Sequence, residues 1–138
     1  MTMSADSGKI EEKEKGEEED IWRMPMILGI EVIHVHYIHP VPYFIKSKQI
    51  EIVEGIEFLV KTSEDFPVRA LSPALFVGDF PVLDVNRIGE NLYRFFVPAP
   101  EIDRLKTSAP ISIGWAGLSA GKVTTEYRFQ VQREESRQ

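Results

Sequence analysis

Hydrophobic residues along this chain come in short runs that Gly, Pro, Asp and Asn interrupt every few positions. The rhythm is clearest between Val68 and Trp115, where each apolar run has the length of a single strand. Short apolar runs separated by turn-forming residues are typical of successive β-strands joined by tight turns. The chain shows no strong helical pattern. The hydrophobic pattern therefore predicts an all-β protein.

Strict alternation is most regular in the segment 123–131. This period of two predicts a half-buried strand with Tyr127 and Phe129 facing the core. Residues 27–38 are apolar on both faces, as in a strand covered on both sides. Gly55 either marks a bulge or turn between two strands or lies within one bent strand. Further elements are expected at 48–53, 56–62, 75–77, 82–85, 92–97 and 110–115 (strands), at 101–107 (a helical turn) and at 117–122 (a hairpin loop).

Seven or eight short strands without a long helix are most simply arranged as two antiparallel sheets packed face to face. We therefore expect an immunoglobulin-like antiparallel β-sandwich over residues 21–133. A length of 138 residues suits one domain with one core, and no internal repeat indicates a second. Residues 134–138 are expected to fray.

The formal net charge of -6 is concentrated at the N-terminus. Residues 1–20 hold eight acidic and three basic side chains, whereas the rest of the chain holds 14 and 13. A segment so polar, without aromatic residues, cannot bury enough apolar surface to offset the entropy lost on ordering. We expect a disordered acidic tail, which either keeps the protein soluble or binds a basic partner. Lys and Arg are not clustered, so the sequence does not favour a nucleic-acid partner.

Several classes of function find no support in the sequence. Without Cys there is no disulfide scaffold, thiolate zinc site or cysteine nucleophile. The signatures of serine hydrolases, zinc proteases and phosphate-binding loops do not occur, so we expect no enzyme. The most apolar segment, 24–35, contains Pro25 and Glu31 and is too short to cross a bilayer. A cytoplasmic protein without a membrane partner is expected, although an exported form whose beginning has been replaced would look the same.

All three histidines fall at the end of the first long strand. On a strand, His34 and His36 share one face about 7 Å apart, within reach of one metal ion. His39 would approach them only through the following turn, and Glu31 or Glu51 could add a carboxylate. The histidines therefore predict either a site for a divalent transition metal or edge imidazoles that hydrogen-bond to neighbouring strands.

Phe, Tyr and Trp are too numerous for all of them to lie deep in a small core. If Tyr43, Phe44, Phe80 and Phe96 share an outer face, they form a patch for a partner protein, a second copy or a sugar ring. The alternative is local packing beneath the proline-rich loops.

Three stretches resemble the IPT/TIG family of immunoglobulin-like domains. Residues 50–58 alternate apolar and polar side chains and end in Gly-x-x-Phe. Residues 75–82 read as a strand, a glycine turn and a short apolar strand, and residues 95–99 as a strand ending in Val-Pro. The resemblance covers residues 24–131 and implies a binding or spacer module. The DNA contacts of some relatives do not carry over, because no basic loop matches them.

These observations predict a non-catalytic interaction module that offers an apolar sheet face or an edge strand to a protein partner or to a second copy. Two alternatives stay open. Exposed aromatic rings would suit a carbohydrate-binding module, and the pair His34 and His36 would suit a metal-binding protein.

Overall fold

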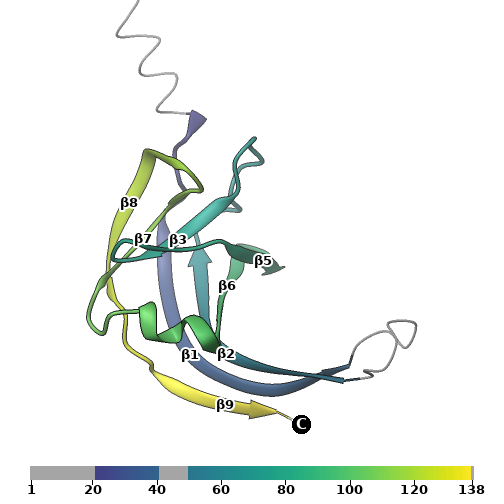
Figure 1. Ribbon diagram of the computed structural model, residues 1–138. Helices are drawn as coiled ribbons and strands as arrows, with labels where there is room; N and C mark the ends of the chain where they lie inside the picture. The colour runs from purple at the N-terminus through teal and green to yellow at the C-terminus, as the bar shows by residue number, and fades with distance from the viewer. Residues whose placement is uncertain (1–20, 41–49, 138) are drawn as a thin grey trace, which may run out of the picture.

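Two β-sheets packed face to face form the protein (Figure 1). The computed structural model describes residues 21–40 and 50–137, without the side chains of residues 38–40, 50, 51 and 137. The predicted acidic tail therefore lies outside the described residues. The elements are β1 (Ile27–Pro40), β2 (Ile50–Thr62), β3 (Pro73–Val77), β4 (Phe80–Val82), β5 (Asp84–Gly89), β6 (Leu92–Pro98), the 3-10 helix η1 (Ala99–Arg104), β7 (Pro110–Trp115), β8 (Leu118–Arg128) and β9 (Arg133–Arg137).

The strand order confirms the predicted immunoglobulin-like sandwich. One sheet has the order β5-β6-β2-β1-β9 and the other β4-β3-β7-β8. Without β9, the first sheet has the four-strand order of immunoglobulin domains, and the second has their three-strand order with β4 added. All pairs are antiparallel except β1 and β9, which run parallel. The described part thus has nine strands rather than the seven or eight expected.

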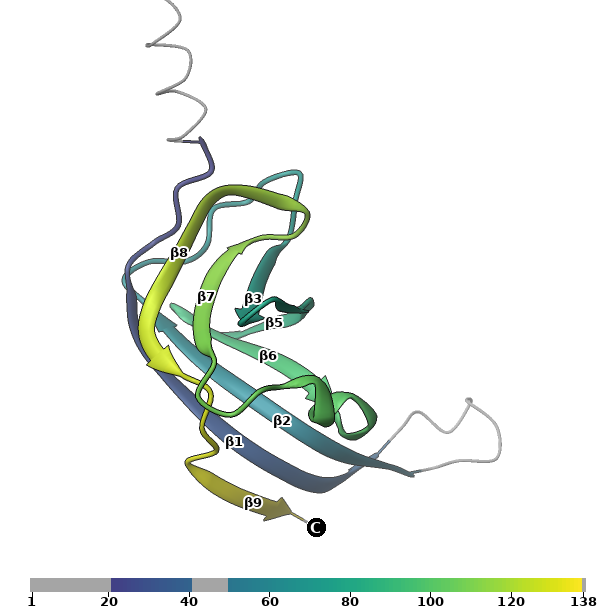
Figure 2. The same ribbon diagram turned by 60° about the vertical axis from the view of Figure 1, so that its left-hand side comes forward.

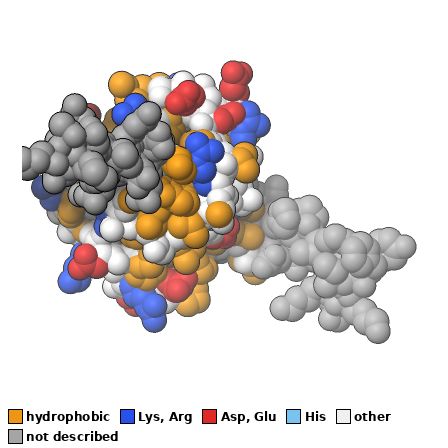
Figure 3. Space-filling model, turned by 90° about the horizontal axis from the view of Figure 1, so that it is seen from above, with side chains coloured by type: hydrophobic (Ala, Val, Ile, Leu, Met, Phe, Trp, Pro, Cys, Tyr) orange, Lys and Arg blue, Asp and Glu red, His pale blue; other side chains and the backbone are white. Residues whose placement is uncertain are grey.

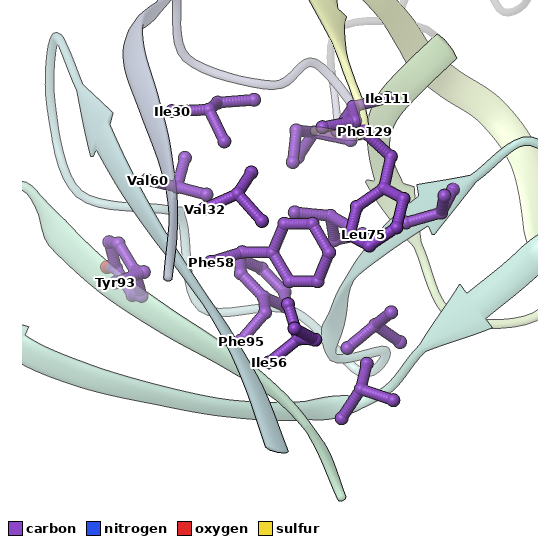
Figure 4. Close-up of a cluster of buried hydrophobic side chains, with 14 of the residues drawn as sticks. Ile30, Val32, Ile56, Phe58, Val60, Leu75, Tyr93, Phe95, Ile111 and Phe129 are labelled. Atoms are coloured by element: carbon purple, nitrogen blue, oxygen red, sulfur yellow. The ribbon is translucent and has the colours of Figure 1, made fainter. Parts of the chain in front are cut away.

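The core lies between the two sheets, and β2 is its central strand (Figure 4). Phe58 of β2 stands opposite Val32 of β1 on one side and Phe95 of β6 on the other, and it is fully buried. Leu75 of β3 and Ile111 of β7 face this layer from the second sheet (Figure 4). Alternate residues of β1, β2, β3, β6 and β7 thus fill the interior, as the sequence predicted.

β2 is continuous through Gly55. The pairing with β1 passes Gly55 without a register shift, so there is neither a bulge nor a turn. A side chain could not be placed there, because the ring of Phe96 and the carbonyl of Val97 occupy its position. The strand expected at 82–85 is instead divided, since β4 ends at Val82 and β5 begins at Asp84.

β8 is an edge strand and is more exposed than its alternation predicted. Phe129, just beyond its end, is buried and Tyr127 packs against the core, as expected, but Val123 is 45% and Val131 41% exposed. The register of β8 against β7 shifts twice, so extra residues in β8 break the period of two. β8 also begins at Leu118, so the loop expected at 117–122 is mostly strand.

The C-terminal segment crosses from one sheet to the other. The N–H of Phe129 donates to the carbonyl of Ala109, and the N–H of Gln132 donates to the carbonyl of Val32. The chain then pairs with β1 as β9, where fraying was expected for residues 134–138. Backbone pairing orders this segment, which a search for apolar alternation does not detect.

The described N-terminal residues are anchored at the end of the sandwich where β7 ends and β8 begins. The indole N–H of Trp115 donates to the carbonyl of Trp22 at 2.7 Å, and the two rings meet edge to face at 5.5 Å. Gly121, at φ +78°, lies so close to this carbonyl that a Cβ would collide with it. Viewed from this end, hydrophobic side chains lie across the middle of the surface (Figure 3). Within the described part, no helix is long and apolar enough to span a membrane.

Candidate functional site

β2 extends beyond the end of its neighbour β6. β6 pairs with β2 from Lys61 only as far as Gly55, which stands opposite Pro98. Proline lacks an N–H, and the chain turns from Pro98 into η1, so the ladder ends there. β2 continues with β1 to Ile50, and Figure 2 shows both strands running on past η1. We call this two-stranded extension, residues 36–40 and 50–54, the arm.

On the side where β6 would lie, the arm has an unpaired strand edge. The described strands supply no neighbour there for residues 50–54, although these residues are regular strand paired with β1. Ile52 lies in the middle of this edge and is 65% exposed. The edge therefore combines backbone groups able to pair with an apolar side chain in contact with solvent.

One hollow lies beside this edge, and a second adjoins the first. One, of about 340 Å³, is lined by residues of β1, β2, β5 and β6. The other, of about 370 Å³, is lined by β4, β5, β6, η1 and the exposed Leu83. Both are lined by Asp84, Phe96 and Pro98. We call the two hollows together the corner groove.

The corner groove has a negative character. Its lining residues include three acidic ones from three different elements, Glu54, Asp84 and Glu101, and one basic one, Arg94. Arg94 Nε lies 3.1 Å from Oε2 of the buried Glu57, and its guanidinium lies 5.0 Å from the centroid of the Phe96 ring. The charge of Arg94 is thus compensated by Glu57, and apart from Arg94 the lining residues include no Lys or Arg that could pair with Glu54, Asp84 or Glu101.

Two of the predicted patch residues meet at the corner groove. Phe80 and Phe96 line the same hollow. Phe80 also packs against the core, and Phe96 is held between Arg94 and Gly55, so both rings are partly buried. Tyr43 and Phe44 lie outside the described residues.

The two histidines predicted as metal ligands face a carboxylate on the arm. Glu54 Oε1 lies 3.7 Å from His34 Nε2, and Glu54 Oε2 lies 3.8 Å from His36 Nδ1. Glu31, considered as a further ligand, is paired with Arg133 instead. The side chains of His39 and Glu51 lie outside the described part. Among the described side chains, no group of three or more His, Asp or Glu residues is arranged to hold a metal ion, so the metal site stays a prediction.

A second surface, at the start of β1, differs from the arm. Met26 and Val123 are 69% and 45% exposed and border a hollow of about 400 Å³. Its strand edge is covered, however. The Tyr127 hydroxyl donates to the Leu28 carbonyl at 3.4 Å, and both the side chain and the backbone of Gln132 bond to Val32.

At the other end of β6, a polar network is fully satisfied. The carboxylate of Asp65 accepts hydrogen bonds from the guanidinium of Arg87 at 3.0 and 3.1 Å and from the N–H of Asn91 at 2.9 Å. These bonds, the one to Arg87 first, hold the pKa of Asp65 below its usual value. Burial raises the pKa of Tyr93, whose hydroxyl accepts a bond from the N–H of Phe66.

Comparison with known proteins adds nothing to this geometry. No family model matches the sequence, and no curated protein or solved structure matches it either.

Proposed function

We propose that this protein is a non-catalytic protein-interaction module that binds an extended segment of a partner along the free edge of β2. The observation that carries this proposal is the unpaired stretch 50–54 of an otherwise regular strand. Free N–H and C=O groups in a regular strand form a template to which another extended chain can pair. The corner groove beside the edge offers room for the side chains of that added strand.

The other strand edges in the described part are poor templates. β9 has four charged side chains in five residues, and β4 is three residues long with Pro81 at its centre. β5 and β8 both have register shifts, which make their edges irregular. The start of β1 is covered by Tyr127 and Gln132. Among the described strand edges, residues 50–54 of the arm are thus regular in pairing and have none of these features, namely a high density of charge, a central proline, a register shift or covering side chains.

The alternatives find less support in the geometry. A sugar ring stacks on a freely exposed aromatic face, but Phe96 lies between Arg94 and Gly55, and Phe80 packs on the core. A metal site needs three or more ligands gathered around one ion, and Glu54 with His34 and His36 does not form such an arrangement among the described side chains. The resemblance to IPT/TIG domains, which implies a binding module, agrees with the proposal.

A neutral model peptide tests this function. The probe is Thr-Val-Thr-Val-Thr-Val, which has strand propensity and no side-chain charge, and its control is Thr-Pro-Thr-Pro-Thr-Pro, whose prolines cannot donate to a ladder. NMR titration of the labelled protein should show saturable shifts in the amides of residues 51–54 with the first peptide and none with the second. Absence of shifts, or shifts confined to β5 or β9, would contradict the proposal.

A further inference from the structure

Resting on this proposed function, we infer that the segment that binds at the arm is basic, with Lys or Arg interspersed among apolar residues. Residues 50–54 provide the edge to which the segment pairs, and the negative charge of the corner groove favours basic segments over acidic ones.

The carboxylates lie on both faces of the position that an added strand would take. Glu54 is on the face of β2 that carries Ile56 and Phe58, toward the interior of the sandwich. Asp84 stands opposite Phe96, which stands opposite Glu57, so Asp84 belongs to the outer face. Alternate residues of a strand point to opposite faces. A bound segment therefore meets negative charge on either side.

These carboxylates are available to a partner. Arg94, the cationic side chain of the groove, already pairs with the buried Glu57. Asp84 is exposed, and Glu54 is 46% exposed with two imidazoles as its neighbours. Lys and Arg have stems long enough to cover apolar surface such as Ile52 while their charged ends reach a carboxylate. An acidic segment would instead place like charges together.

The expected preference follows from the usual strength of exposed ion pairs. One such pair contributes about 0.2–1 kcal/mol, or about a 1.4- to 5-fold change in affinity. Because the three Lys of Lys-Val-Lys-Val-Lys-Val share one face of a strand, they reach the carboxylates of one face only, which are one or two of the three. The peptide should therefore bind more tightly than the neutral Thr-Val peptide by between about 1.4-fold and 25-fold. Because exposed charges are screened by salt, the preference should shrink at about 0.5 M NaCl.

The test compares three peptides and two charge-matched variants by fluorescence anisotropy. We expect the Lys-Val peptide to bind more tightly than the Thr-Val peptide, and a Glu-Val peptide to bind least tightly. The triple variant Glu54→Gln/Asp84→Asn/Glu101→Gln should lose this preference and still bind the Thr-Val peptide. The control Glu64→Gln/Glu90→Gln/Glu126→Gln removes the same charge at exposed positions elsewhere and leaves residues 1–20 unchanged, so it should keep the preference.

Each other outcome overturns a defined part of the argument. If the Thr-Val peptide binds and the Lys-Val peptide binds no better, the inference is wrong and the proposed function stands. The inference is also wrong if both triple variants lose the preference equally, because the Lys residues then respond to overall charge. If sedimentation shows a dimer that Ile52→Lys dissociates, the occupant of the edge is a second copy and not a basic segment. If no peptide binds, the proposed function itself fails.

Discussion

The two halves of β2 have similar sequences and different surroundings. Residues 55–62 lie between β1 and β6 beneath the second sheet, and Ile56, Phe58 and Val60 are at most 1% exposed. Residues 50–54 begin with the same alternation, which Val53 and Glu54 reverse, and among the described strands they have β1 alone beside them, with Ile52 65% exposed. Alternation thus buries side chains in one half, whereas the other half keeps an exposed pairing edge. Mutations should separate the two roles.

The largest expected difference concerns side-chain truncation in each half. Phe58→Ala removes a fully buried ring that packs near Phe129 at 5.9 Å, and it should lower the free energy of unfolding by about 3–5 kcal/mol. Ile52→Ala should change it by less than about 0.5 kcal/mol, because that side chain is mostly in solvent. Urea denaturation measures both. Equal losses would mean that the arm belongs to the cooperative core.

The junction between the halves gives the next effect. Gly55→Ala places a Cβ against the Val97 carbonyl, and backbone cannot move aside as a side chain can. We expect a loss of about 3 kcal/mol in the free energy of unfolding. The matched control is Gly29→Ala, where a Cβ would meet no described atom closer than the Tyr127 hydroxyl at 4.0 Å. If both variants are equally stable, the backbone at Gly55 can shift to make room for a side chain, and the close contact with β6 does not constrain this position.

A smaller effect is expected at the buried ion pair beneath the corner groove. Arg94→Met leaves the carboxylate of Glu57 buried without its partner, which should cost about 2 kcal/mol. Arg133→Met breaks the exposed pair with Glu31 and should cost less than about 1 kcal/mol. Thermal denaturation compares the variants. A stable Arg94→Met protein would mean that Glu57 is not held by Arg94.

The fold could be predicted largely from alternation and turn residues, because both follow from short-range geometry. What the sequence did not reveal depends on neighbours. The bulges of β8 depend on pairing with β7, and β9 is held by backbone bonds to β1, so neither has an apolar signature. The close contact between Gly55 and Phe96 could not be predicted for the same reason, because it forms between two different strands, β2 and β6.

The candidate site could be predicted in part. Counting aromatic residues singled out Phe80 and Phe96, which do line one hollow. The free edge was missed, because alternation shows which face a residue takes and not where the adjacent strand stops. A signal was present nonetheless. Pro98 and Pro100 end a strand expected at 92–97, whereas the stretch from 48 to 62 is longer. Once these two segments are known to pair, the difference in length leaves part of the longer one without that neighbour.

The polar network at the far end of β6 provides the last and smallest contrast. The pKa of Asp65 is lowered in the folded protein, chiefly by the bonds from Arg87. The ionised carboxylate therefore stabilises the fold fully at pH values above 3.8, the pKa of Asp65 in the unfolded chain. That contribution disappears as the pH falls from 3.8 through the lower folded value. Asp65→Asn should therefore reduce the melting temperature at pH 7, and the gap to the wild type should narrow near pH 3. Asp84→Asn, in the corner groove, should leave the melting temperature unchanged at pH 7, since the groove carboxylate is exposed. If Asp84→Asn lowers the melting temperature as much as Asp65→Asn does, the corner groove stabilises the fold as well, and the two ends of β6 do not differ in role.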